Sequence, residues 1–269
     1  LWAATDVDPK NENPELTTSE PYVMGSHATG SGAWCSGPED VSPPEYFWGY
    51  NRMTTIEGLF GAGDAVGGTP HAFSSGSFTE GRLAAKAACK YIDDGKAEGI
   101  VVSDEQIKRR MEEIFKPMEH YRIFRNEIVA GDVNPHYINP KQGLDRLQKL
   151  MDEYCGGVTV NYMTNEKLLN IGLKKLAIME EDLEKLAAED IHGLLRAWEL
   201  KHRHRAAECV TQHTLFRKET RWPGYYYRGD AMKVDDENWH VLTVSRRDPA
   251  TGEYTMEKAP CYHLVSDDE

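Results

Sequence analysis

The chain has little basic charge for its size. It carries 31 Lys and Arg residues against 44 Asp and Glu residues, and its formal net charge is −13 at pH 7. Nucleic-acid-binding modules need a basic face, so this balance argues against a nucleic-acid partner. The densest basic run, residues 201–205, falls on an expected helix, and we interpret it as a solvated or inter-subunit face.

Cysteines are few, and none lies close to another in the sequence. The five are separated by more than fifty positions in every case: Cys35, Cys89, Cys155, Cys209 and Cys261. Iron–sulfur and zinc sites are typically built on closely spaced cysteine pairs, and an odd, scattered set does not suggest a disulfide framework. We therefore expect reduced thiols, no metal site in this chain and a cytoplasmic location.

Long apolar runs are also missing. No stretch of 18 apolar residues occurs, and the first residues do not have the charged start and apolar middle of a signal peptide. The motif Gly-x-Gly-x-x-Gly, with which dinucleotide-binding folds begin, is absent as well. An apolar content of 40% nevertheless predicts a globular chain with a real core.

The most informative feature that is present is residues 58–82, where a short apolar segment leads into a glycine-rich turn and a helix. The turn contains four glycines: Gly61, Gly63, Gly67 and Gly68. Glycines let the backbone approach a bulky ligand, and Asp64 stands where a strand would end. Ser77 and Glu80 have the spacing of a capping box, and a helix start offers free N–H groups. Taken alone, the pattern fits a nucleotide-cofactor site and a tight turn before a capped helix equally well.

This segment resembles the second flavin-binding motif of the fumarate reductase and succinate dehydrogenase flavoprotein superfamily. Four stretches carry a closer resemblance to one family within it. They are residues 20–27, 32–40, 69–77 and 217–230. These stretches are similar to the alpha subunits of dissimilatory adenylylsulfate reductase, and the similarity runs through most of the chain.

The resemblance implies an FAD enzyme that converts adenosine 5′-phosphosulfate and two electrons to AMP and sulfite, and that also works in reverse. The FAD is expected to be bound non-covalently. Electrons are expected to come from a beta subunit that carries iron–sulfur clusters, since nothing in this chain's cysteine pattern suits a cluster. Any contact with a membrane would be indirect, through an electron-donor complex.

The resemblance also implies which residues hold the flavin. Asp64 resembles the superfamily acid that accepts hydrogen bonds from the ribityl hydroxyls. The main-chain N–H groups of Ser77 and Phe78 would face the pyrimidine side of the flavin and stabilise negative charge there. The expected cofactor-binding residues are Gly63, Asp64, Ser74, Ser75, Gly76, Ser77 and Phe78.

His27 is the expected catalytic residue, because the superfamily has a histidine that reaches the substrate beside the flavin. An imidazole can donate a hydrogen bond to a sulfite or sulfate oxygen and titrates near neutral pH. A structural role for a lone histidine is the alternative.

The glycine turn departs from the superfamily at residues 71–75. Fumarate reductases have His-Gly-Ala-Asn-Arg in this turn, whereas this chain has His-Ala-Phe-Ser-Ser, so the arginine that clamps a dicarboxylate is missing. An aromatic side chain suits a nucleobase, and we expect Phe73 to stack on adenine. His71 is expected in the same substrate site, behind the residues that contact the substrate directly. The alternative for Phe73 is packing in the hydrophobic core.

The expected fold is an α/β FAD-binding segment followed by a mainly helical C-terminal domain with a terminal β-hairpin. We expect residues 1–20 to connect from a capping domain, residues 21–102 to complete the FAD-binding domain and residues 103–269 to form the helical domain. Because the superfamily fingerprint is absent and the chain starts at Leu1, we interpret it as the C-terminal portion of a larger protein. Alone, it is expected to bind FAD poorly.

Within the helical domain, a capping box at residues 103–106 predicts a helix that stops before Pro117. Leucines at helical spacing over residues 168–186 predict a second helix, and Asp190 can cap a third that pairs with it antiparallel. Alternating apolar residues predict a hairpin near residues 239–258.

A charged run close to the hairpin, Arg217, Glu219 and Arg221, resembles the superfamily's Arg-x-Glu-x-Arg motif. We interpret it as structural ion pairing.

Two other functions remain open. One alternative is a different fumarate reductase-type oxidoreductase that acts on fumarate or aspartate, and the absence of the dicarboxylate-clamping arginine disfavours it. The other is a non-catalytic assembly fragment when the chain is isolated.

Overall fold

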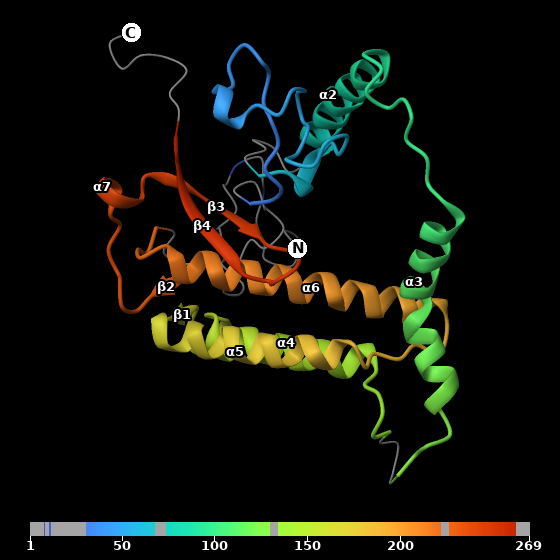
Figure 1. The fold of residues 1–269 in the computed structure, drawn as a ribbon. Helices are drawn as coiled ribbons and strands as arrows, with labels where there is room; N and C mark the ends of the chain where they lie inside the picture. Colours follow the sequence, from blue (N-terminus) through green and yellow to red (C-terminus); the bar gives the residue numbers. More distant parts are fainter. Residues whose placement is uncertain are drawn as a thin grey trace. The chain divides into compact units, whose positions relative to one another are not determined.

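The computed structural model describes Asp8, Asn11 and residues 31–67, 74–129, 134–221 and 226–261 (Figure 1). The chain separates into two compact units, Leu1–Asp94 and Gly95–Glu269. No helix among the described residues is both long enough and apolar enough to span a bilayer.

In the first unit, the glycine turn is held by isolated backbone bridges and one long helix. The bridged pairs are Ala33–Val66, Cys35–Thr54 and Met53–Phe60. The helical elements are the short 3₁₀-helices η1 (Pro44–Tyr46) and η2 (Gly63–Ala65) and the α-helix α2 (Ser74–Asp93). The strand expected before the turn shortens to a single bridge at Phe60, because Gly58, at φ +77°, and Gly61 enclose only two apolar residues.

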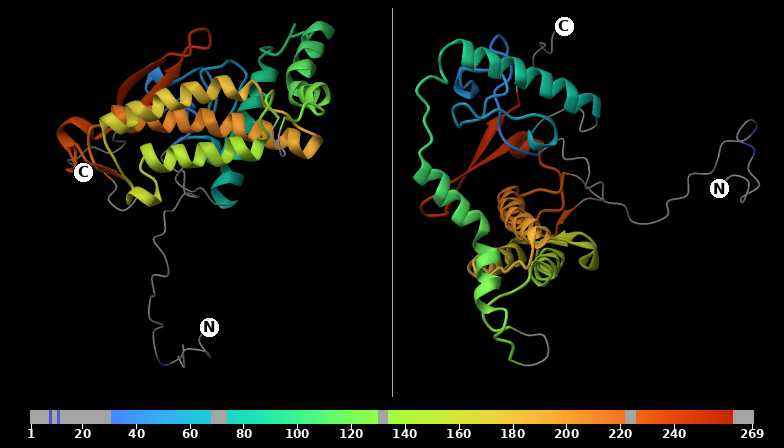
Figure 2. Two further views of the ribbon diagram at one scale, coloured as in Figure 1. Left: turned by 90° about the horizontal axis from the view of Figure 1, so that it is seen from below. Right: turned by 90° about the vertical axis from the view of Figure 1, so that its right-hand side faces the viewer.

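Four long helices make up most of the described part of the second unit. They are α3 (Asp104–Phe124), α4 (Pro140–Tyr154), α5 (Glu166–Leu183) and α6 (Ile191–Phe216). Helices α4, α5 and α6 lie side by side, and α5 and α6 run antiparallel (Figures 1 and 2). Their apolar faces meet in one core, made of Leu147, Leu150, Leu176, Met179, Leu183, Leu186, Ala197, Leu200 and Ala207. The mainly helical character expected of this region is confirmed.

Two of the predicted helix starts are confirmed by their caps. At α3, the Gln106 amide donates to Ser103 Oγ at 3.2 Å, and the Ser103 amide donates to Gln106 Oε1 at 2.8 Å. At α6, Asp190 Oδ1 accepts from the Gly193 amide at 2.7 Å. Each cap satisfies N–H groups that the first helical turn leaves without intrahelical partners.

The prediction that the first of these helices stops before Pro117 is wrong. Helix α3 continues to Phe124 with Pro117 buried inside it. The carbonyl of Pro117 accepts a hydrogen bond from the Ala188 amide at 2.9 Å. Burial and this tertiary contact accompany the continued helix, in which Pro117 itself donates no intrahelical bond.

Helix α4 is not among the predicted elements, although the sequence carries its start signals. Asn139 and Gln142 form a reciprocal capping box, with distances of 2.9 and 3.0 Å. Pro140 occupies the first helical position, where a missing N–H costs nothing.

The basic run at residues 201–205 lies on α6, as expected, but it is only partly solvated. Lys201 pairs with Glu184 at 3.1 Å, and Arg205 pairs with Glu180 at 2.6 Å. His204 is 2% exposed, with Nε2 2.8 Å from the Leu176 carbonyl oxygen. For His204 the interpretation as a solvated face is therefore wrong, because this side of α6 turns toward α5.

Near its end, the chain forms an antiparallel strand pair, β3 (Val241–Arg247) and β4 (Tyr254–Pro260), with Val241 opposite Pro260. Asp248 shapes the turn between the strands by accepting hydrogen bonds from the backbone amides of Ala250 and Thr251. Trp239, expected in a strand, lies instead in the short helix α7 (Asp236–Trp239). Asp235 caps this helical turn by accepting from the Asn238 amide, so the strand starts only at Val241.

Two short strands tie the end of α6 back to the start of α5. After the 3₁₀-helix η3 (Val158–Val160), β1 (Met163–Thr164) pairs in parallel with β2 (Tyr227–Arg228). The Tyr227 amide donates to the Tyr162 carbonyl and the Gly229 amide to the Thr164 carbonyl, both at 2.7 Å.

Glu219 is the centre of the predicted ion-pair cluster, which is confirmed. Its side chain is fully buried, and its carboxylate accepts from Arg217 at 2.5 Å and from Arg221 at 2.6 and 3.0 Å. The Asp235 amide adds a bond at 2.9 Å. Burial by itself raises the pKa of Glu219, but these hydrogen bonds outweigh it and the pKa is lowered.

Arg228, inside the family motif at residues 217–230, is fully buried. Its guanidinium binds both oxygens of Asp230, at 2.9 and 3.0 Å, and donates to the Leu215 and Arg217 carbonyls. The hydrogen bonds from Arg228 hold the pKa of Asp230 at about 2. Arg228 therefore closes the end of α6, where carbonyl groups lack helical partners.

Candidate functional site

The expected flavin-binding residues that the structure describes come together in the first unit. Gly63 and Asp64 form part of η2. The others, Ser74, Ser75, Gly76, Ser77 and Phe78, open α2. A Cβ atom on Gly63 would lie 3.1 Å from Ser77 Oγ, so the glycine turn and the helix start are in contact. His27, His71 and Phe73 lie outside the described residues.

The glycine turn is tightly built. Gly63 has φ +65°, a left-handed conformation that favours glycine, and the Val66 amide donates to its carbonyl at 3.0 Å. A Cβ atom on Gly61 would lie 2.8 Å from both Cys35 Sγ and Val66 Cγ2. The turn therefore has no room for side chains on its inner side, which fixes the path of the backbone.

The outer side of this site offers both acceptors and donors. Asp64, Ser74 and Ser75 are exposed, and Phe78 is 81% exposed although it is a large apolar residue. The first turn of α2 presents backbone N–H groups at the positive end of the helix dipole. A carboxylate, helix-start amides and an apolar ring in one place can hold a polyol chain and the electron-rich edge of an aromatic ring.

The prediction of a capping box at Ser77 and Glu80 is wrong. Helix α2 already starts at Ser74, so Ser77 lies inside its first turn. Glu80 is 4% exposed and pairs with Arg52 at 2.6 Å instead. A glutamate that caps its own helix is solvated, whereas this one is carried inward and needs a cation.

Cys35 lies under the turn, beside Arg52. Burial raises the pKa of its thiol, and the nearby Arg52 charge offsets only part of that rise. The neutral thiol is therefore the dominant form near neutral pH. The described residues contain no group of three or more His, Cys, Asp or Glu side chains placed to bind a metal ion.

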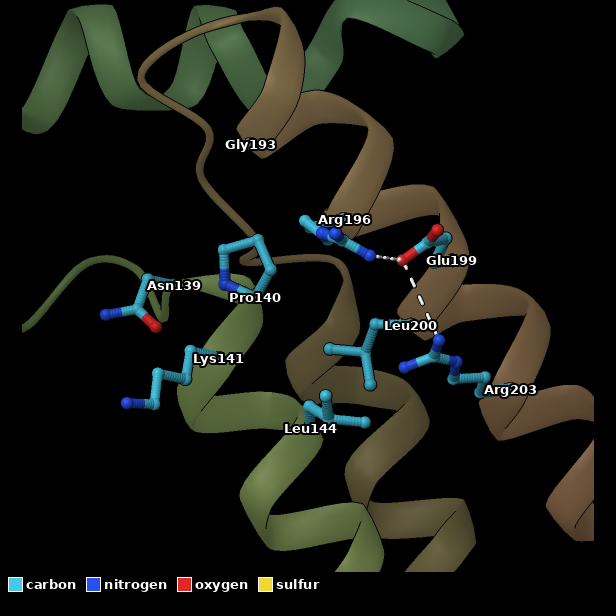
Figure 3. A pocket seen from close by; sticks show the side chains of 9 residues that line it. All are labelled: Asn139, Pro140, Lys141, Leu144, Gly193, Arg196, Glu199, Leu200 and Arg203. Atoms are coloured by element: carbon cyan, nitrogen blue, oxygen red, sulfur yellow. Dashed lines mark hydrogen bonds and ion pairs between the residues drawn. The ribbon is translucent and has the colours of Figure 1, made fainter.

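A hollow lies in the second unit, between the start of α4 and α6 (Figure 3). It has a volume of about 460 Å³ and an apolar floor that includes Leu144 and Leu200. Arg196 and Arg203 both point to Glu199, at 2.7 and 3.8 Å, so their charges are partly neutralised within the rim. None of the predicted site residues lines this cavity.

The second unit defines the class of protein. Residues 144–264 match the family model described as the fumarate reductase flavoprotein C-terminal domain, and the match begins inside α4 and ends beyond β4. Over these residues the chain is therefore similar to flavoproteins of the fumarate reductase type, as the sequence motifs predict.

Particular relatives are adenylylsulfate reductases. The chain is 41% identical over its whole length to the adenylylsulfate reductase alpha subunit of Megalodesulfovibrio gigas and spans 41% of that protein. Adenylylsulfate reductase from Archaeoglobus fulgidus is 49% identical, with a TM-score of 0.86 over 98% of this chain and 42% of its own. The same values hold for a solved structure of adenosine-5-phosphosulfate reductase in complex with sulfite, a covalent adduct. The resemblance drawn from the motifs is thus confirmed along the whole chain.

The ion pair of Arg52 and Glu80, which supports the glycine turn, is not predicted from the sequence. Arg52 belongs to no motif, and Glu80 has the spacing of a capping box that the structure does not contain. One signal was present: Glu80 follows the apolar face of α2, since it lies seven residues before the buried Ala87. A charged residue on a buried face predicts a buried partner.

Proposed function

We propose that this chain is the part of an FAD-dependent adenylylsulfate reductase alpha subunit that holds the isoalloxazine end of the cofactor. The observation that carries the proposal is the 41% identity to such a subunit over the entire chain, including the glycine turn and the start of α2. The established relatives are more than twice as long as this chain, so activity belongs to the full-length protein.

The turn and the helix start suit FAD, because a left-handed Gly63 allows α2 to approach within contact distance. We assign the ribityl hydroxyls to Asp64 and the pyrimidine edge of the ring to backbone amides among Ser74–Phe78. Bound there, FAD would supply two-electron chemistry. The amides at the positive end of α2 would stabilise negative charge at that edge.

The substrate would be adenosine 5′-phosphosulfate, and the reaction would be reversible. Its reduction adds two electrons to sulfur and breaks the sulfur–oxygen bond to the phosphate, which leaves AMP and sulfite. We assign His27 to the sulfur oxyanion, as a hydrogen-bond donor at the atom where charge builds up. Phe73 would stack on the adenine, with His71 behind it.

Electrons would reach the site from a beta subunit with iron–sulfur clusters. The wide spacing of the five cysteines supports placing the clusters in another subunit, because a cluster needs several thiolates close together.

The test uses the full-length protein loaded with FAD, supplied with AMP, sulfite and an artificial electron acceptor. We expect electron transfer that requires both AMP and sulfite, with adenosine 5′-phosphosulfate as the product. Reduction of fumarate, or oxidation of succinate or aspartate, without a response to AMP would instead assign the chain to another enzyme of the superfamily. Inactivity toward both substrate classes, with no flavin bound, would favour the assembly role.

Replacing Phe73 with Ala in the full-length protein should weaken binding of AMP and adenosine 5′-phosphosulfate while the FAD content stays unchanged. Loss of one base-stacking contact costs about 1–3 kcal/mol, which is roughly 5- to 160-fold in Kd. Calorimetric titration with AMP measures the change, and Phe73→Tyr, which keeps the ring, serves as the control. An unchanged Kd would assign Phe73 to the core.

A further inference from the structure

A buried ion pair lies beneath the glycine turn. Arg52 Nη2 donates to Glu80 Oε1 at 2.6 Å, and the two side chains are 19% and 6% exposed. Glu80 belongs to the second turn of α2, and Arg52 precedes the glycine turn in the sequence. We call this pair the Arg52–Glu80 clamp.

The clamp carries costs that a purely stabilising contact would avoid. Both charges are largely removed from water, and a buried ion pair often contributes little net stability. Arg52 Nε and Glu80 Oε2 are buried and make no hydrogen bond within the described part of the chain. Arg52 also has φ +64°, which is unfavourable for a residue with a Cβ atom. Strained backbone and unsatisfied buried groups are typical of functional sites, where a particular geometry is needed even if it lowers stability.

The geometry in question is the spacing of the two segments that form the proposed flavin site. The Arg52 carbonyl accepts from the Gly61 amide at 2.9 Å, and the Arg52 amide donates to the Ser36 carbonyl at 2.8 Å. The backbone of Arg52 therefore fixes the first glycine of the turn. Its side chain fixes α2 through Glu80, three residues after Ser77, which touches Gly63. One residue thus ties both segments together.

We propose that Arg52 and Glu80 are positioning residues of the flavin site, which set the distance between the glycine turn and the amides at the start of α2. This inference rests on the proposed function. Amide dipoles act on charge at short range, so a shift of the helix start weakens FAD binding and makes the flavin harder to reduce.

The test compares Glu80→Ala, Glu80→Gln and Arg52→Lys in the full-length protein. We expect FAD to bind the Glu80→Ala apoprotein about 10- to 100-fold more weakly, by analogy with the loss found when the hydrogen-bond partners of metal ligands are removed. The midpoint potential of the bound flavin should become more negative. Glu80→Gln keeps the shape and one acceptor, so its effect should be smaller but in the same direction.

The matched control is Lys90→Ala, which removes an exposed ion pair from the same helix. Lys90 binds Asp94 at 2.7 Å, and the two side chains are 68% and 40% exposed. This variant should keep the wild-type FAD affinity and potential, since exposed pairs contribute little.

Thermal unfolding of the apoproteins separates positioning from bulk stability. A lower unfolding temperature with unchanged FAD affinity and potential, measured well below that temperature, would overturn the proposal in favour of a structural pair. If Glu80→Ala does not fold, Glu80→Gln and Arg52→Lys decide in the same way. Unchanged affinity and potential in a wild type that binds FAD overturn this inference alone, whereas a wild type without FAD overturns the proposed function with it.

Discussion

Replacing Glu219 with Ala is expected to lower the free energy of unfolding by about 3–5 kcal/mol. The substitution leaves the guanidinium groups of Arg217 and Arg221, whose side chains are only 17% and 22% exposed, without the anion between them. It also leaves the Asp235 amide without its acceptor. Urea-induced unfolding of the chain, followed by tryptophan fluorescence, measures the change, because Trp239 lies beside Arg217.

The control is Glu257→Ala in β4. Glu257 pairs with Arg246 at 3.6 Å, and these side chains are 46% and 63% exposed. Removing such a pair should change the free energy of unfolding by no more than about 0.5 kcal/mol. If Glu219→Ala loses as little as this control, the other partners of the two arginines, Asp236 and the Trp239 and Val241 carbonyls, compensate for the lost carboxylate, and the prediction is wrong.

Replacing His27 with Ala in the full-length protein should reduce turnover per bound flavin about 10²-fold or more. We expect the fold and the FAD content to remain, because the proposed contact is to the sulfur oxyanion at the step where charge moves. Turnover is measured with AMP and sulfite and is divided by flavin content determined from absorbance.

A structural histidine gives a different pattern in the same experiment. The variant would then unfold at a lower temperature or lose flavin, and the surviving holoprotein would keep its rate. Normal turnover per flavin would remove His27 from the proposed catalytic residues. His27→Asn, which retains a donor but cannot titrate, distinguishes hydrogen bonding from proton donation by the pH dependence of turnover.

The helical part of the fold was readable because its signals are local. Ser103 and Asp190 cap their helices through residues three positions away, and apolar spacing defines α5. The errors at Pro117 and Trp239 have the opposite character. Pro117 is buried inside a helix, where its carbonyl accepts from the Ala188 amide of a distant segment, and Trp239 joins a helical turn capped by Asp235. No local pattern at Pro117 announces such a partner.

In the candidate site, too, only the residues with a local sequence pattern are predictable. Glycine spacing predicts Gly63 and the start of α2, because left-handed turns favour glycine. No sequence pattern predicts the role of Arg52, because that role depends on an ion pair with Glu80 in α2. The pairing within residues 217–221 was foreseen because its members are neighbours in sequence, whereas the contacts of Arg228 with the carbonyls that end α6 were not.

The parallel pair of β1 and β2 makes the stretch between them a closed loop that contains both α5 and α6. Closing a long loop costs chain entropy, and contacts that require it form later in folding than contacts between sequence neighbours. We therefore expect α5 and α6 to pair before the Tyr227 and Gly229 amides close the loop. Protection of these two amides from hydrogen exchange would then report that the loop between β1 and β2 is closed, whereas protection within α5 would report only that this helix has formed.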